Sequence, residues 1–191
     1  MRTKVNYQLI LNPFVDVQEP MIIGQGQYLL QSLANMIDNP IQIPLIGSNY
    51  QNHGNLHVNI LPTDANGVFD EENEDLFIEE PEELLERGRL DFAVEIEKAT
   101  DLPSNFCKDV YVEYEIFIDG PKYKTQVIEG KNRHPEFLYR MQHVRDPMTQ
   151  EFLDYLMNRN VSFKVFGFPD VEKADDKKEE TNDKKNDQNT L

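Results

Sequence analysis

The sequence of 191 residues contains a single cysteine, no tryptophan and no long apolar run. One cysteine excludes an internal disulfide, so the chain is not a disulfide-stapled secreted scaffold, and a reducing cytoplasmic compartment is expected. A membrane-spanning helix needs about eighteen consecutive apolar residues, and no such stretch occurs. Asn6 and Gln8 interrupt the N-terminal stretch MRTKVNYQLILN, which therefore lacks the apolar region of a signal peptide.

The chain also lacks clustered positive charge. Its net charge is −16, and residues 70–86 contribute most of it, with ten acidic and no basic residues. Residues 1–69 and 87–169 are nearly neutral, at −2 and −1, and residues 170–191 carry −3. Because nucleic acid binding requires a concentrated positive field, no nucleic-acid partner is expected.

Catalytic and ligand-binding motifs are missing as well. There is no nucleotide-binding P-loop and no G-x-S-x-G elbow, and the GQG at residues 24–26 lacks the third glycine of a dinucleotide fingerprint, so it indicates a bulge or tight turn. No family signature surrounds Cys107, which favours a small buried structural residue over a nucleophile. His53 and His57 flank a Gly-Asn loop, and two ligands without a third hold zinc poorly. We expect no enzyme activity, no cofactor and no metal.

Four regions differ in composition. Residues 1–68 form an N-terminal β segment, and residues 69–88 form an acidic linker that is too charged to bury, with at most one helical turn at Pro81–Leu85. The linker also lacks the spacing of a calcium-binding EF-hand. Residues 89–169 hold the clearest strand patterns, whereas residues 170–191 have no apolar periodicity and are predicted to be a disordered charged tail. Without a sustained heptad pattern, a monomer is expected.

Alternating apolar residues predict strands. Leu90, Phe92, Val94 and Ile96 fall on one face of the clearest example, a period of two that is typical of a half-buried strand. Similar patterns occupy residues 54–62, 109–118, 122–130, 136–144 and 161–168. One short helix is predicted after Thr149, a suitable N-cap. Many short strands with one helix predict an all-β, antiparallel β-sandwich.

A small basic set lies on and after the strand predicted at 122–130. Its members are Lys122, Lys124, Lys131, Arg133 and His134. Two interpretations stay open for it. The set forms either a solvated face paired with nearby glutamates or a binding site for anionic lipid headgroups, where each Lys or Arg would contribute on the order of 1 kcal/mol.

The stretch LDFAVEIEKATDLPSNFCKDVYVEYEIF, residues 90–117, resembles the opening of a C2 domain, with a strand, an A-x-x-L-P loop and a strand beginning Asp-x-Tyr-Val. With GNLHVNILPTD, GKNRHPEFLYRMQHV and TQEFLDYLMNRNVSFKVFGFPDV added, residues 12–171 resemble the C2-like region of kinesin-3-type microtubule motors. The ATP site of that family lies in a head that these residues do not match. The resemblance implies a non-catalytic structural, cargo- or partner-binding module on the cytoskeleton, in cilia in some members.

The alternative that a C2 likeness implies is a calcium-independent membrane adaptor. Such an adaptor would bind anionic phosphoinositides through the basic set.

The order of the C2-like strands is unusual. In an ordinary C2 domain two further strands follow the one that residues 161–168 resemble, and here the charged tail follows instead. Residues 20–33 and 41–62 resemble the end of a C2 domain. We therefore expect the N-terminal third to complete the same sandwich, as in a circular permutation, since two incomplete modules would leave unpaired edges and open apolar faces.

The resemblance does not extend to calcium. Calcium-binding C2 loops present about five carboxylates, because the ion takes six to eight oxygen ligands. Asp109 matches one of these positions, but residues 104–106 offer none, and Gly167 and Phe168 replace two others, which leaves only Asp170. Asp109 and Asp170 are therefore interpreted as remnants of a lost site. We expect Asp109 to accept backbone N–H bonds and Cys107 to pack beneath its loop.

Overall fold

The computed structural model describes residues 19–170 apart from 71, 73–75 and 118–119. The tail beyond residue 170 and the first eighteen residues lie outside this description. The strands are β1 (Met21–Leu29), β2 (Ile41–Ile46), β3 (Asn52–Pro62), β4 (Leu90–Thr100), β5 (Lys108–Glu115), β6 (Lys122–Lys124), β7 (Ile128–Lys131), β8 (Glu136–Arg145) and β9 (Asn160–Phe168). The helices are α1 (Gln31–Ala34), α2 (Glu83–Arg87) and α3 (Gln150–Asn158).

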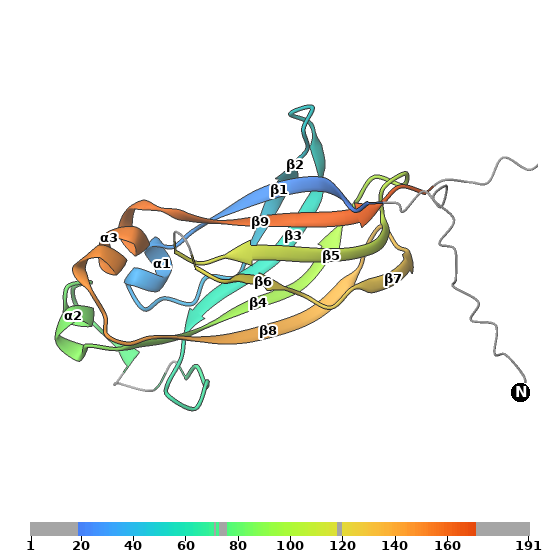
Figure 1. Cartoon of the computed structure of the whole chain (residues 1–191). Helices are drawn as coiled ribbons and strands as arrows, with labels where there is room; N and C mark the ends of the chain where they lie inside the picture. The colour runs from blue at the N-terminus through green and yellow to red at the C-terminus, as the bar shows by residue number, and fades with distance from the viewer. Residues whose placement is uncertain (1–18, 71, 73–75, 118–119, 171–191) are drawn as a thin grey trace, which may run out of the picture.

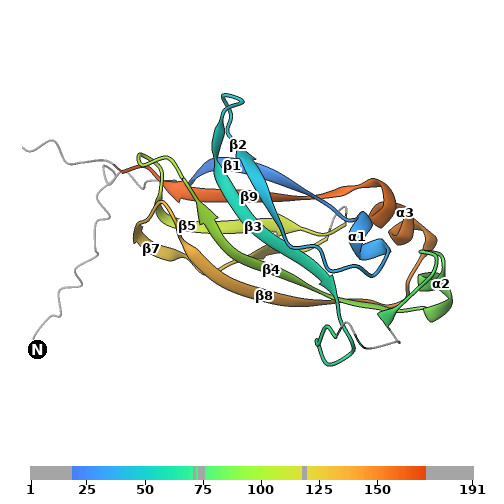
Figure 2. The ribbon, with the colours of Figure 1, turned by 180° about the vertical axis from the view of Figure 1, so that it is seen from behind.

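All strands belong to one antiparallel sheet that curls on itself (Figures 1 and 2). The strand order is β6-β5-β9-β1-β2-β3-β4-β8, and β7 also pairs with β5. The curl brings the half formed by β6, β5, β9 and β1 opposite the half formed by β2, β3, β4 and β8, which gives a sandwich-like arrangement around one apolar core. The predicted all-β, antiparallel fold is confirmed.

Strands from the N-terminal third lie in the middle of this sheet. β1 pairs with β9 on one side, β3 pairs with β4 on the other, and the sheet edges are formed by later parts of the chain. Side chains from both parts enter the same core, among them Tyr28, Leu56, Phe92, Val112 and Phe163. Residues before and after the acidic segment thus build a single sheet.

The glycines at residues 24 and 26 allow β1 to approach β2 closely. A Cβ on Gly24 would lie 2.9 Å from the Cβ of Leu45, and one on Gly26 would lie 2.8 Å from Cδ1 of Ile43. The pairing of β1 with β9 shifts register between Ile22 and Gly24. The GQG motif therefore marks a β-bulge and a close strand contact, as the sequence predicts, because glycine alone leaves room for the neighbouring strand.

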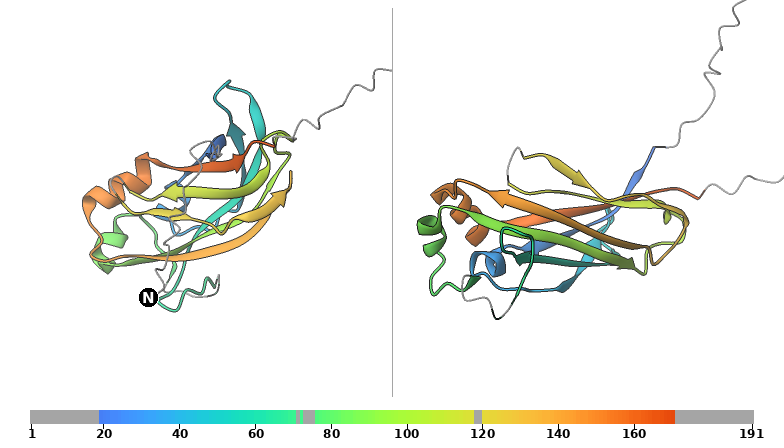
Figure 3. Two further views of the ribbon diagram at one scale, coloured as in Figure 1. Left: turned by 45° about the vertical axis from the view of Figure 1, so that its right-hand side comes forward. Right: turned by 90° about the horizontal axis from the view of Figure 1, so that it is seen from below.

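The helices gather at one end of the strands (Figure 3). α3 is the predicted helix, and the side-chain oxygen of Thr149 accepts a hydrogen bond from the backbone N–H of Phe152 at 3.3 Å, as expected of an N-cap. α1 and α2 are single turns. α2 begins two residues later than the turn predicted at Pro81–Leu85, and its Leu84 is fully buried. Leu84 therefore anchors the acidic linker in the core, which the prediction of a solvated loop did not include, whereas the described acidic side chains of the linker are exposed or only partly buried.

The strand predicted at 122–130 is divided into β6 and β7, which both pair with β5. Thr125, between them, is buried. Its backbone N–H donates to the Val112 carbonyl, and its hydroxyl accepts from the Val112 N–H, both at 3.0 Å. A side-chain hydroxyl thus replaces one backbone ladder bond of β5, and the strand is interrupted there.

Candidate functional site

The loop end of the sandwich comprises residues 101–109, 128–134 and 167–170. Cys107 is buried there, with its Sγ 3.6 Å from the Ser104 carbonyl oxygen. Asp109 has a φ of 50°, and its Oδ1 accepts a hydrogen bond of 2.7 Å from the N–H of Gly130. Both expectations for these residues are confirmed. The bond from Gly130 ties β5 to β7 at the point where their register shifts.

The second remnant carboxylate is also bound within the chain. Oδ2 of Asp170 lies 2.5 Å from Nζ of Lys131, and the backbone N–H of Asp170 donates to the Asn105 carbonyl at 3.0 Å. Among the residues that the structure describes, no group of three or more His, Cys, Asp or Glu side chains is arranged to hold a metal ion.

The five members of the basic set lie at two separate places. Lys122 and Lys124 stand opposite Glu115 and Glu113 of β5, whereas Lys131 stands opposite Lys108. Glu113 and Lys108 are separated by five residues of strand, about 16 Å. Arg133 and His134 follow Lys131 at the loop end.

Several of these basic side chains have partners in the same chain. Nζ of Lys124 lies 3.5 Å from the centre of the Tyr111 ring, a cation–π contact. Nε of Arg133 donates to the Leu102 carbonyl at 2.8 Å, and Nδ1 of His134 accepts from the backbone N–H of Asp101 at 3.2 Å. The geometry resembles the solvated, partly paired face more than a single headgroup site.

The two N-terminal histidines lie on strand β3, not on either side of a loop, so the sequence interpretation was wrong there. Nδ1 of His53 is 2.7 Å from the Ile23 carbonyl oxygen. The strand separates His53 from His57 by four residues, about 13 Å, too far for both to bind one ion. Gly54, between them, has a φ of 107° and packs against the Thr100 carbonyl, so a close strand contact explains that glycine.

A second candidate surface, the linker end, lies where the helices gather. It comprises residues 36–38, 63–70, 76–91 and the facing Gln142, and it contains two adjacent grooves that share Met36 and Leu76. The apolar groove has a volume of about 320 Å³ and is lined by Met36, Ile37, Asp38, Phe69, Asp70, Leu76 and Phe77. The polar groove has about 500 Å³ and is lined by Met36, Thr63, Asp64, Ala65, Asn66, Leu76, Leu84, Arg87, Arg89, Leu90 and Asp91.

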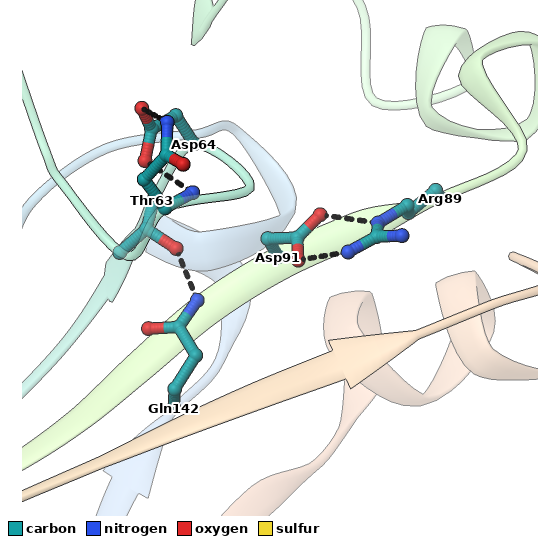
Figure 4. Close-up of polar contacts among 6 residues, drawn as sticks. Thr63, Asp64, Arg89, Asp91 and Gln142 are labelled. Atoms are coloured by element: carbon teal, nitrogen blue, oxygen red, sulfur yellow. Dashed lines mark hydrogen bonds and ion pairs between the residues drawn. The ribbon is translucent and has the colours of Figure 1, made fainter.

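Hydrogen bonds at the ends of β3, β4 and β8 lie in and beside the polar groove (Figure 4). The guanidinium of Arg89 donates two hydrogen bonds, of 2.7 and 2.8 Å, to the carboxylate of Asp91, which is only 9% exposed. The hydroxyl of Thr63 accepts from Nε2 of Gln142 at 2.6 Å, and the Thr63 N–H donates to the Asp91 carbonyl at 3.0 Å. These polar groups satisfy one another, so they fix the ends of β3, β4 and β8.

Carboxylates also hold the two loops beside the apolar groove. Oδ1 of Asp64 accepts from the N–H groups of Asn66 and Val68, at 2.9 and 2.8 Å, and these bonds lower the pKa of Asp64. Oε1 of Glu83 accepts from the N–H groups of Glu79 and Glu80, at 2.7 and 2.9 Å. Those two bonds likewise lower the pKa of Glu83 below its ordinary value.

Large apolar side chains remain exposed on two hydrogen-bonded segments. One is the turn at residues 36–38, where the Ile37 N–H donates to the Ser32 carbonyl, and the other is the loop before α2 that Glu83 holds. Ile37 is 55% exposed and Phe77 is 61% exposed, although Leu76, the neighbour of Phe77, is buried. The guanidinium of Arg87 donates to the Phe77 carbonyl oxygen and so holds the backbone of that residue. The sequence interpretation missed this surface, and the signal that could have found it is the apolar triplet Leu76-Phe77-Ile78 inside the acidic run.

Comparisons with known proteins give no family for this chain. A scan against protein-family models finds no match, and a search of curated proteins finds none either. No helix in the described part of the chain has the length and apolar character needed to cross a membrane.

Proposed function

We propose that this chain is a non-catalytic, C2-like partner-binding module of a kinesin-3-like transport system, and that it binds its partner through the linker end. The observation that carries the proposal is the exposure of Ile37 and Phe77 on segments whose backbones are held by hydrogen bonds, from the Ile37 N–H to the Ser32 carbonyl and from Arg87 to the Phe77 carbonyl. Exposed apolar side chains at a concave, ordered surface are typical of protein-binding sites, where aromatic anchors supply much of the binding energy.

The surroundings of the candidate nucleophile and bases support a non-catalytic role. The thiol of Cys107 is buried against the Ser104 carbonyl. Hydrogen bonds of His53 and His134 go to backbone groups, and Nε2 of His143 lies 3.0 Å from the buried hydroxyl of Tyr114. None of these bonds pairs a base with an accessible nucleophile, the arrangement that covalent catalysis requires.

The transport context of the proposal comes from the sequence. Motifs spread over residues 12–171 resemble the C2-like region of kinesin-3-type motors in the same order. We accordingly place the module in the cytoplasm, on the cytoskeleton or in a cilium, with a motor subunit or cargo adaptor as its partner.

Proximity labelling in cells tests this proposal. The wild-type chain, the double variant Ile37→Ser/Phe77→Ser and the control Leu138→Ser would be compared; Leu138 lies on β8 and is 75% exposed. We expect the wild type and the control to label the same motor or cargo-adaptor proteins, and the double variant to lose them. The proposal would be refuted if the double variant labelled the same proteins as the wild type, or if no transport protein were labelled.

Flotation with anionic vesicles tests the competing membrane-adaptor function. Since Lys122 and Lys124 face Glu115 and Glu113, and the chain carries a net charge of −16, we expect no binding at low salt. Binding that disappears in Lys122→Glu/Lys124→Glu would replace the partner-binding proposal with the membrane adaptor.

A further inference from the structure

We infer that the apolar groove binds a short protein segment in which apolar anchors are flanked by lysine or arginine, that is, a basic amphipathic segment. This inference rests on the proposed function and adds the chemistry of the partner. Three properties of the groove lead to it: its lining, the charge around it and the rigidity of its walls.

The lining determines which apolar side chains the partner can bring. Five of the seven lining side chains are apolar, and residues 36–38 line the groove together with Phe69, Asp70, Leu76 and Phe77. The volume of about 320 Å³ lies at the small end of the range for binding pockets, so it accommodates a few side chains of one segment and not a broad protein surface.

The charge sets the flanking part of the partner. Asp38 and Asp70 are the two polar lining residues, and residues 70–86 contain ten acidic and no basic residues. The nearest cations are committed elsewhere, because Arg89 binds Asp91 and Arg87 donates to the Phe77 carbonyl. Such a surface attracts a cationic segment and repels anionic lipid, which favours a protein partner over a membrane.

The rigidity of the walls favours binding without refolding. Arg87 holds the carbonyl of Phe77 and Glu83 holds the backbone two and three residues after it, while Leu76 and Leu84 of the same segment are buried. Ordering of loops normally subtracts from affinity, and here the loop is ordered before the partner arrives. Phe77 therefore acts as a preformed anchor.

A defined peptide tests the inference on the full chain. The probe is an amphipathic Leu/Lys peptide of about 14 residues, or four helical turns. A Leu/Glu peptide reverses its charge, and a Ser/Lys peptide removes its apolar face. Titration calorimetry would measure the affinity at about 50 and about 300 mM salt. The higher salt concentration screens exposed charges, so the comparison separates electrostatic from apolar binding. We expect Leu/Lys to bind, Leu/Glu not to bind, and Ser/Lys to bind weakly and only at low salt.

Two pairs of variants separate the groove from general attraction to an acidic protein. We expect Ile37→Ser/Phe77→Ser to weaken Leu/Lys binding about tenfold or more, and Leu138→Ser to leave it unchanged. The linker triple Glu79→Gln/Glu80→Gln/Glu82→Gln should weaken binding more than the tail triple Glu179→Gln/Glu180→Gln/Asp183→Asn. Both triples remove three negative charges, and the linker triple leaves Glu83 intact.

The outcomes distinguish the inference from the proposed function. Affinity that is unchanged in Ile37→Ser/Phe77→Ser, or equal weakening by the two triples, overturns the inference. If the Leu/Lys peptide fails to bind while that double variant still loses its cellular partners, the partner-binding function stands and only the basic amphipathic chemistry is wrong. If the double variant binds the peptide with unchanged affinity and also labels the same cellular partners as the wild type, the proposed function is wrong as well.

Discussion

At both ends of the sandwich, carboxylates bind groups of the same chain, but only the linker end presents a large exposed apolar side chain. At the loop end, Asp109 binds the Gly130 N–H and Asp170 binds Lys131, so groups that resemble an ion site are occupied by the chain itself. At the linker end, Glu83 also binds backbone N–H groups, but the loop that it fixes presents the exposed ring of Phe77. Internal hydrogen bonds thus remove one candidate site and build the other.

Removing the anchor of the linker end is expected to have the largest effect. Leu84 in α2 is fully buried, so Leu84→Ala should lower the free energy of unfolding by about 2–5 kcal/mol, through lost apolar burial and the cavity that remains. Urea unfolding at pH 7 measures it. The control Leu138→Ala, at a position that is 75% exposed, should stay within about 0.5 kcal/mol of the wild type. Equal effects for the two variants would mean that the linker is not anchored.

Acid should lower the stability of the fold through His143, in the middle of the molecule, at a higher pH than through the carboxylates of the linker end. His143 of β8 is buried between the two halves of the sheet, where its ring stacks on Phe92 at 5.1 Å and its Nε2 lies 3.0 Å from the Tyr114 hydroxyl. Burial lowers the pKa of His143 from 6.5 to about 4. Between these values the unfolded chain binds a proton that the folded chain does not bind, so folding becomes less favourable as pH falls.

The resulting loss has a defined window and size. The contribution of neutral His143 is fully present above pH 6.5 and declines by about 3 kcal/mol as pH falls toward 4. The pKa values of Asp64 and Glu83 are lowered instead, so their stabilising effect is lost only as pH falls below the ordinary values of 3.8 and 4.5. Urea unfolding at several pH values should show the earlier decline in the wild type and a flatter profile in His143→Gln. Parallel profiles would contradict this order.

The sequence predicted the parts of the fold that local pattern determines. The alternation at Leu90, Phe92, Val94 and Ile96 predicted a strand, because successive side chains of a strand point to opposite faces of the sheet. Thr149 predicted the start of a helix, because capping depends only on neighbouring residues. These features need no knowledge of distant segments.

The sequence did not predict the linker end, because burial there depends on distant segments. Leu76 and Leu84 sit among ten acidic residues, so local composition indicates solvent, and only tertiary packing, in which α2 contacts α3, buries Leu84 in the core. Gly54 was interpreted as part of a loop for the same reason. It serves a close contact with the Thr100 carbonyl on the neighbouring strand, which no local pattern reveals.

At the loop end, a smaller effect is expected from Asp109. Its φ of 50° is costly for most residues but tolerated by Asn and Asp, and its Oδ1 accepts from Gly130. Asp109→Ala should lower the free energy of unfolding by about 1–2 kcal/mol, because the hydrogen bond is lost and the backbone strain remains. Asp109→Asn keeps an acceptor and the tolerated backbone, so chemical denaturation should place it near the wild type. Similar losses for both variants would point to the negative charge as the stabilising property.

Calcium is expected to have the smallest effect, namely none. An ion at the loop end would need six to eight oxygens, yet Asp109 already accepts from a backbone N–H, and the ammonium of Lys131 lies 2.5 Å from Asp170. Calcium would have to displace the Lys131 ammonium from Asp170. Lys131 belongs to the same chain, so its binding costs no translational entropy, whereas the binding of a free ion does. The melting temperature should therefore be the same with and without calcium, and titration calorimetry should show no micromolar binding. Binding that disappears in Asp109→Asn would reverse the comparison and make the loop end a ligand site in its own right.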